Sequence, residues 1–175
     1  MTMLAILLSD SDTTGHAYAV SADGIAVDSH GAAPAALLPV APRQEVVAVV
    51  PAGRLSWQRT TLPRGGHKAD TPRLRAVLGG LLEERLLDDV ESLHFAIEPH
   101  ARAGAPVWVA VCEKAWLQGE LRLLESAGHR IARVVPERSP LPLEAGGELP
   151  LPLVHVSGTP EQPLVTVATS GCSGV

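Results

Sequence analysis

Proline is distributed unevenly along this chain of 175 residues, and its positions limit where regular structure can form. Seven of the fifteen prolines lie between Pro136 and Pro163. Because proline fixes the backbone φ angle and has no amide hydrogen to donate, such a density disfavours helices and central strands. We therefore predict a first α/β region over residues 1–135, a Pro/Gly-rich connector over 136–149, and the opening hairpin of a second, incomplete lobe over 150–175.

Composition and charge exclude several classes of protein. Hydrophobic residues make up 46% of the chain, so intrinsic disorder is not expected. The net charge of -5 gives no cationic field for nucleic acid, and the five aromatic residues offer few stacking platforms. No apolar stretch approaches the ~18 residues that a membrane helix requires, and residues 3–8 lack the basic flank of a signal peptide. We expect the chain as given to be soluble and cytoplasmic.

Short apolar runs separated by turn residues predict a series of strands. We expect them over residues 4–8, 16–20, 25–27, 45–50, 57–62, 93–97, 107–111 and 131–135, with a further hairpin over 153–156 and 164–168. Asp23-Gly24 is typical of a two-residue hairpin turn. Pro51-Ala52-Gly53 separates two of these strands and predicts a second hairpin.

Two segments have the spacing of amphipathic helices. In the first, from Pro72 to Leu86, leucine and valine recur at steps of three and four residues. Its Gly79-Gly80 pair weakens the helix, or marks a bend or a close contact. The second begins near Lys114 and stops at Gly128. Helices combined with these strands predict an α/β fold in which a mixed sheet carries packed helices.

No residue pattern indicates catalysis, a metal or a cofactor. The seven histidines have no partner at ligand spacing, and Cys112 lies inside an apolar run where a buried thiol is expected. The turn Ser9 to Gly15 superficially resembles the D-x-G-T-T turn of actin-like ATPases. It has no glycine at its middle, and Asp10 and Asp12 would repel a phosphate rather than bind it. We therefore predict no catalytic residue, no metal site and no cofactor, and we expect that the protein is not an enzyme.

Charge is arranged in two blocks around the first helix. Basic residues precede it and enter its first turn, and acidic residues follow near its end, which is the reverse of what the helix dipole favours. Something other than helix stability can account for this order, and a polar docking surface for a protein partner is one such cause. The candidate partner-binding residues are Arg73, Arg75, Glu83, Glu84, Asp88, Asp89 and Glu91.

The same segment carries a family resemblance. Residues 82–95 read L-E-E-x-L-x-D-D-V-E-x-L-H-F, with x for the variable positions. This pattern resembles a segment in the cytoplasmic region of the type II secretion system protein L family. Residues 46–62 are similar to a strand pair of that family, and the later strands follow in the same order, so the resemblance extends over about residues 1–170.

The resemblance implies a fold and a role. It implies an actin-like architecture built from RNase H-like units, here with the second lobe incomplete and without the family's membrane helix. It implies a non-catalytic cytoplasmic scaffold of the bacterial inner-membrane platform, which recruits the secretion ATPase, protein E, through that enzyme's N-terminal domain for protein export. Protein M and a second copy of the chain are the implied partners of the full-length, membrane-anchored protein.

Three alternatives remain open at this stage. A partner strand could add to the edge of a hairpin such as residues 46–62, in place of docking on the acidic residues. An actin-like nucleotide-binding ATPase is the second, and a calorimetric titration with ATP and Mg²⁺ separates it from a scaffold. An RNA-handling RNase H-like domain is the third; it needs acidic residues on several strands, and residues 107–111 carry none.

Overall fold

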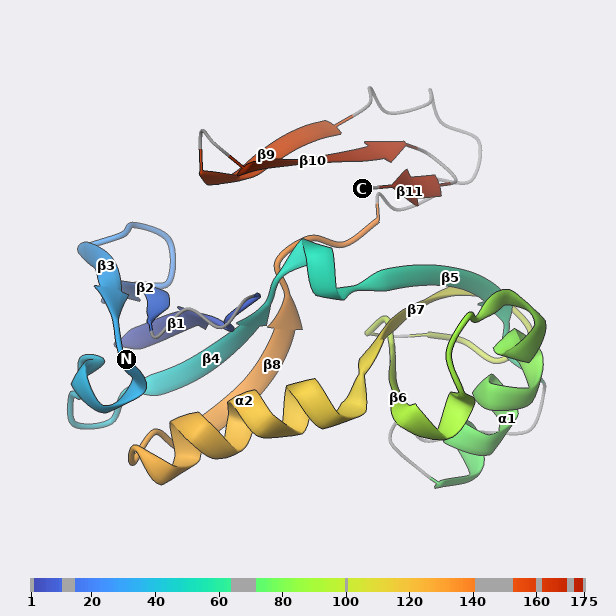
Figure 1. Ribbon diagram of the computed structural model, residues 1–175, viewed down its shortest axis with the longest axis horizontal. Coiled ribbons are helices and arrows are strands. Elements are labelled where there is room, and N and C mark those ends of the chain that lie inside the picture. The colour runs from blue at the N-terminus through green and yellow to red at the C-terminus, as the bar shows by residue number, and fades with distance from the viewer. Residues whose placement is uncertain are drawn as a thin grey trace. The chain divides into compact units, whose positions relative to one another are not determined.

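A computed structural model describes residues 2–10, 15–63, 72–99, 101–140, 153–159, 162–169 and 172–174 (Figure 1). Contacts divide the chain into two compact units. Unit 1 consists of Met1–Arg54 and Lys114–Arg138, and unit 2 consists of Leu55–Glu113 and Ser139–Val175. The predicted α/β region over 1–135 thus contributes to both units, and the predicted connector lies outside the described residues beyond residue 140. No helix among the described residues is long and apolar enough to cross a membrane.

Unit 1 is built on a five-stranded mixed sheet. Its strand order is β3 (Ser29–Ala33), β2 (His16–Ser21), β1 (Met3–Leu7), β4 (Glu45–Val50) and β8 (Ile131–Pro136). The three strands from β1 to β3 pair antiparallel, whereas β4 runs parallel to both β1 and β8. β4 carries a nearly continuous apolar run, with four of its six residues buried, as expected for a strand in the centre of a parallel arrangement.

Helix α2 (Lys114–Ser126) packs against this sheet in unit 1, in contact with β8 and with the short 3-10 turn η1 (Ala35–Leu37). Leu117 and Leu124 are its buried side chains. The helix is followed by Gly128, whose φ of 92° is the left-handed conformation that terminates helices. The predicted second helix and its glycine stop are confirmed.

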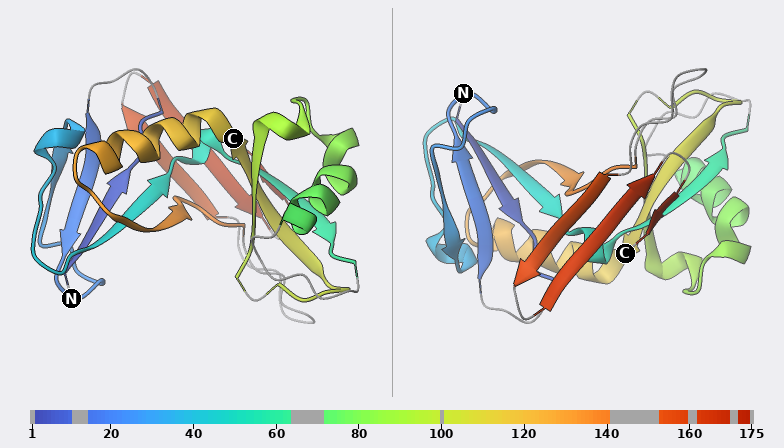
Figure 2. Two further views of the ribbon diagram at one scale, coloured as in Figure 1. Left: turned by 90° about the horizontal axis from the view of Figure 1, so that it is seen from below. Right: turned by 90° about the horizontal axis from the view of Figure 1, so that it is seen from above.

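Unit 2 contains a separate antiparallel sheet. β7 (Pro106–Glu113) lies at its centre between β5 (Ser56–Thr61) and β6 (Leu93–Ile97), and helix α1 (Pro72–Leu82) follows β5 in the chain. Figure 2 shows α1 beside this sheet from two further directions. The helix and the sheet enclose one apolar core, formed by Leu62, Leu74, Leu78, Leu82, Leu93, Val107, Val109 and Val111.

Two 3-10 turns, η3 (Glu83–Arg85) and η4 (Val90–Ser92), connect α1 to β6. The predicted helix is therefore confirmed in position, but its end at Leu86 is wrong because the chain tightens into η3 after Leu82. Leu86 still packs against the edge of the core from outside the helix.

A third sheet follows the proline-rich stretch. β9 (Leu153–Thr159) and β10 (Gln162–Thr169) pair antiparallel over seven positions, and β11 (Cys172–Gly174) pairs with β10. The predicted hairpin over 153–156 and 164–168 is confirmed, with both strands longer than expected.

Two turn predictions are wrong. Pro51-Ala52-Gly53 does not close a hairpin: the chain forms the 3-10 turn η2 (Ala52–Arg54) there and passes from one sheet to another, because β4 is already paired on both sides. Asp23-Gly24 does not form a two-residue hairpin turn either: the strand expected over 25–27 is a loop, and β2 pairs with β3, which begins at Ser29. Asp23 produces this longer turn because its carboxylate accepts the amides of Ile25 and Ala26.

The two neighbouring glycines of α1 differ in their surroundings, and substitution by alanine separates them. A Cβ on Gly79 would lie 2.6 Å from Val90 Cγ1, whereas a Cβ on Gly80 would meet nothing within 4 Å. We expect Gly79→Ala to lower the free energy of unfolding by about 1–3 kcal/mol through overpacking. Gly80→Ala, the matched control, should raise it by up to about 1 kcal/mol through helix propensity. Urea denaturation checks both, and equal effects would contradict the close contact.

Candidate functional site

The predicted partner-binding residues come together on one segment of unit 2, from α1 through η3 to η4. The five carboxylates of Glu83, Glu84, Asp88, Asp89 and Glu91 belong to exposed residues. None of them forms an ion pair within the part of the chain that the structure describes. We call these five residues the acidic segment. Because its charges are not neutralised by described neighbours, it presents an anionic surface to solvent.

The two predicted arginines differ in role. Arg73 is exposed on the first turn of α1. Arg75 is half-buried, and its Nη2 donates to the carbonyl oxygens of Glu91 and Leu93, at 3.0 and 2.9 Å. Arg75 therefore fixes the end of the acidic segment to α1 and has less of its guanidinium free for a partner.

η4 is held in place by three further features. The Asp89 carboxylate accepts the amide of Glu91 at 2.9 Å, which caps the turn. The Asp89 carbonyl oxygen accepts both the amide and the hydroxyl of Ser92. Val90 lies against Gly79, where a side chain would leave no room. The close contact that Gly79-Gly80 suggested is thus present at the first glycine.

The end of α1 changes the electrostatic argument. Because the helix stops at Leu82, Glu83 and Glu84 lie in the 3-10 turn beyond it, next to the carbonyl groups at the C-terminus. Their charges still face the negative end of the helix dipole, which is unfavourable by a few tenths of a kcal/mol for each exposed charge. The order of charge around α1 is thus unfavourable for the helix in the structure as well as in the sequence.

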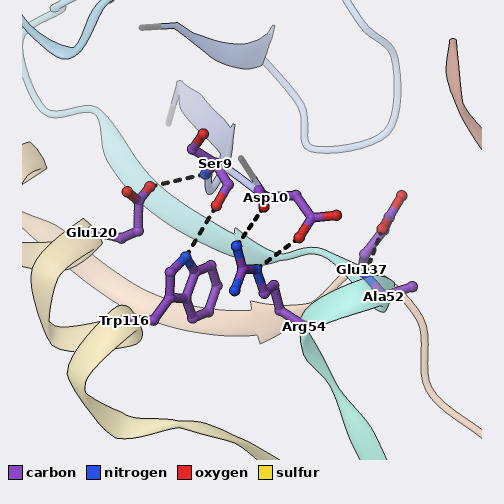
Figure 3. A network of polar contacts seen from close by, with 7 residues as sticks. All are labelled: Ser9, Asp10, Ala52, Arg54, Trp116, Glu120 and Glu137. Atoms are coloured by element: carbon purple, nitrogen blue, oxygen red, sulfur yellow. Dashed lines mark hydrogen bonds and ion pairs between the residues drawn. The ribbon is translucent and has the colours of Figure 1, made fainter. Parts of the chain in front are cut away.

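A second polar network lies in unit 1, after β1 (Figure 3). The Ser9 amide donates to Glu120 Oε2 at 2.9 Å, and the Trp116 indole donates to the Ser9 carbonyl oxygen at 3.1 Å. Arg54 Nε donates to the Asp10 carboxylate at 2.7 Å, and its guanidinium lies 5.3 Å from the centre of the Trp116 ring. Sequence analysis missed this network, because its members are remote in the chain.

This network bears on nucleotide binding. Residues 11–14 of the turn lie outside the described residues. At the described position 9, the backbone amide that could approach a phosphate already donates to the carboxylate of Glu120. A carboxylate at this place repels an anion. Glu120, supplied by α2, is therefore a further acidic group that opposes phosphate binding here, whereas the charge of Asp10 is paired with that of Arg54.

Two histidines and Cys112 lie inside the protein. His16 and His129 are buried, with ring nitrogens 3.0 Å from Glu120 Oε2 and from the Ala35 carbonyl oxygen respectively. Burial, with a smaller contribution from the Glu113 charge, raises the pKa of the Cys112 thiol to about 11, so it is protonated near neutral pH. Among the described residues, no group of three or more His, Cys, Asp or Glu side chains could hold a metal ion.

Comparisons with known proteins bear on the family and the fold of the chain. The family model described as "Type II secretion system (T2SS), protein L" matches residues 5–148. The structure is similar to the cytoplasmic domain of EpsL, an inner-membrane component of the type II secretion system of Vibrio cholerae, with a TM-score of 0.66 and 21% identity over 99% of this chain and 70% of that one. This likeness confirms the predicted actin-like α/β fold.

Two further findings complete the comparisons. A chain of a PilM-PilN type IV pilus biogenesis complex matches with a TM-score of 0.44 and 17% identity, over 78% of this chain and 46% of that one. A search of curated proteins finds no match.

Replacement of Glu120 tests whether the network after β1 is a structural support. Glu120→Ala removes the acceptor of the Ser9 amide and leaves the buried His16 ring without its partner, so we expect unfolding to become easier by about 1–3 kcal/mol. Glu120→Gln retains an acceptor oxygen and should cost less. Urea denaturation followed by tryptophan fluorescence measures both variants, and an alanine variant as stable as the parent would refute this role.

Proposed function

Because the chain belongs to the type II secretion system protein L family, we propose that it is a non-catalytic scaffold which recruits the secretion ATPase, protein E, to the inner-membrane platform. Family membership over residues 5–148 ties the chain to type II secretion and is the observation that carries the proposal. In this proposal the chain is the cytoplasmic part of a bacterial inner-membrane protein, with protein M and a second copy of itself as partners of the full-length protein.

The acidic segment is the docking surface in this proposal. It is exposed, its carboxylates have no described cationic partner, and its backbone is fixed by Arg75 and by the Val90 contact with Gly79. A fixed charged surface gives orientation and a fast association rate to a partner of opposite charge. The N-terminal domain of protein E is the partner we assign to it.

The alternative docking mode, addition of a partner strand to a sheet edge, would use a different edge from the one predicted. Residues 46–62 do not form a hairpin, so the prediction of a free edge along that hairpin is wrong. In this stretch β4 is paired on both sides, and β5 is an edge strand of the three-stranded sheet. At that edge, Arg85 Nη1 donates to the carbonyl oxygen of Arg59 at 2.8 Å. An incoming strand would have to displace this guanidinium, which favours docking on the acidic segment.

Charge reversal tests the docking surface. Glu83→Lys together with Glu84→Lys should weaken binding of the ATPase N-terminal domain by roughly tenfold at low salt, and less at high salt, because the attraction is screened. Each single variant should lie between the double variant and the parent. Glu125→Lys, an exposed reversal on α2, is the control and should bind like the parent.

These binding measurements test the acidic segment and ATPase recruitment separately. Unchanged affinity of the double variant would overturn the assignment of the acidic segment and leave recruitment standing. Failure of the parent chain to bind the ATPase domain would overturn recruitment itself. Thermal unfolding at the same midpoint in all variants confirms that only the surface has changed.

Calorimetric titration with ATP and Mg²⁺ tests the competing nucleotide-binding function. We expect no saturable heat, since the Ser9 amide already donates to Glu120 and the Arg54 guanidinium is already paired with Asp10. Binding in the micromolar range would contradict the scaffold proposal and favour an actin-like ATPase.

A further inference from the structure

Leu87 stands in the middle of the acidic segment with its side chain wholly in solvent. Its exposure is 104%, the highest among the exposed large apolar residues that the structure describes. The preceding Leu86 is partly buried against the core of unit 2. The two adjacent leucines therefore lie in different environments.

The chain on both sides of Leu87 is fixed. On one side, Arg85 reaches β5 through its hydrogen bond to the Arg59 carbonyl oxygen. On the other side, the Asp89 carboxylate caps η4. Arg75 also holds this part of the chain, because it donates to the carbonyl oxygens of Glu91 in η4 and Leu93 in β6. A side chain that is presented by a fixed backbone loses little conformational entropy when a partner binds it.

The charges around Leu87 define the partner that fits. Carboxylates flank it at Glu83 and Glu84 before and at Asp88, Asp89 and Glu91 after, and the intervening cation, Arg85, is engaged with β5. An apolar centre with a charged rim is the usual anatomy of a protein interface. An anionic lipid surface would repel the same carboxylates. The complementary surface is an apolar pocket bordered by Lys or Arg.

We propose that Leu87 is the apolar anchor of the docking surface and inserts into a pocket with a basic border on the N-terminal domain of the secretion ATPase. The identity of this partner rests on the proposed function, whereas the pocket chemistry rests on Leu87 and its flanking carboxylates. The acidic segment then sets orientation and association rate, and Leu87 sets the lifetime of the complex.

Leu87→Ala tests the anchor without a risk to folding, because the side chain makes no contribution to the core. We expect the dissociation constant for the ATPase N-terminal domain to rise roughly tenfold or more, mainly through faster dissociation. This fold increase in the dissociation constant should be the same at about 50 and about 300 mM NaCl, because an apolar contact is not screened by salt. The fold increase caused by the glutamate reversals should instead fall at the higher salt concentration. Ile25→Ala, which removes a 91% exposed side chain from unit 1, is the matched control and should bind like the parent.

Other results would overturn the proposed anchor, and each can be told from the others. Parent binding that Leu87→Ala leaves unchanged overturns the anchor but not ATPase recruitment, whereas absence of binding by the parent overturns both. Sedimentation that shows Leu87→Ala dissolving a dimer, with ATPase affinity unchanged, would identify a second copy as the occupant and overturn the inference. Loss of binding to phosphatidylglycerol vesicles, again with unchanged ATPase affinity, would overturn it in favour of a membrane surface.

Discussion

The parallel pairing of β4 with both β1 and β8 governs the course of the chain. A parallel neighbour cannot be reached by a tight turn, so the chain needs a long connection between β4 and β8. That connection includes α2 and also residues 55–113, which form most of the described part of unit 2. Where the chain leaves β4, the Ala52 amide donates to Glu137 and Arg54 pairs with Asp10, so segments of unit 1 from before and after residues 55–113 are bonded to one another.

This constraint explains which parts of the fold were predictable. Helix positions and most strands follow from local spacing, and those predictions are confirmed for α1, α2 and β6 to β8. The Pro51–Gly53 turn was wrong because a hairpin and a sheet-to-sheet passage have the same turn residues, and only the distant β8 decides between them. The strand expected over 25–27 failed for a local reason, since Asp23 binds the amides that a strand would need.

The charge of the acidic segment could be predicted from the sequence, but the contacts that hold its backbone could not. Charge along the chain located the acidic segment, whereas the hydrogen bonds of Arg75 to the backbone of residues 91 and 93 could not be foreseen from the sequence. The apolar spacing places Leu86 on the buried face and leaves Leu87 off it, and the structure agrees, although Leu86 packs on the core from outside the helix. The distinction arises because α1 ends at Leu82 and the following turns are fixed by Arg85, Asp89 and Gly79.

An actin-like fold does not by itself imply nucleotide chemistry, because function depends on the sites that a fold carries. In this chain the turn after β1 is tied to α2 by Glu120 and Trp116, so the described part of the turn supports the sheet rather than presenting free amides. The exposed, fixed and uncompensated groups lie elsewhere, on the segment between α1 and β6. Because Arg75 and Asp89 hold the backbone of this segment while its carboxylates and Leu87 lie in solvent, it is the surface that we propose a protein partner binds.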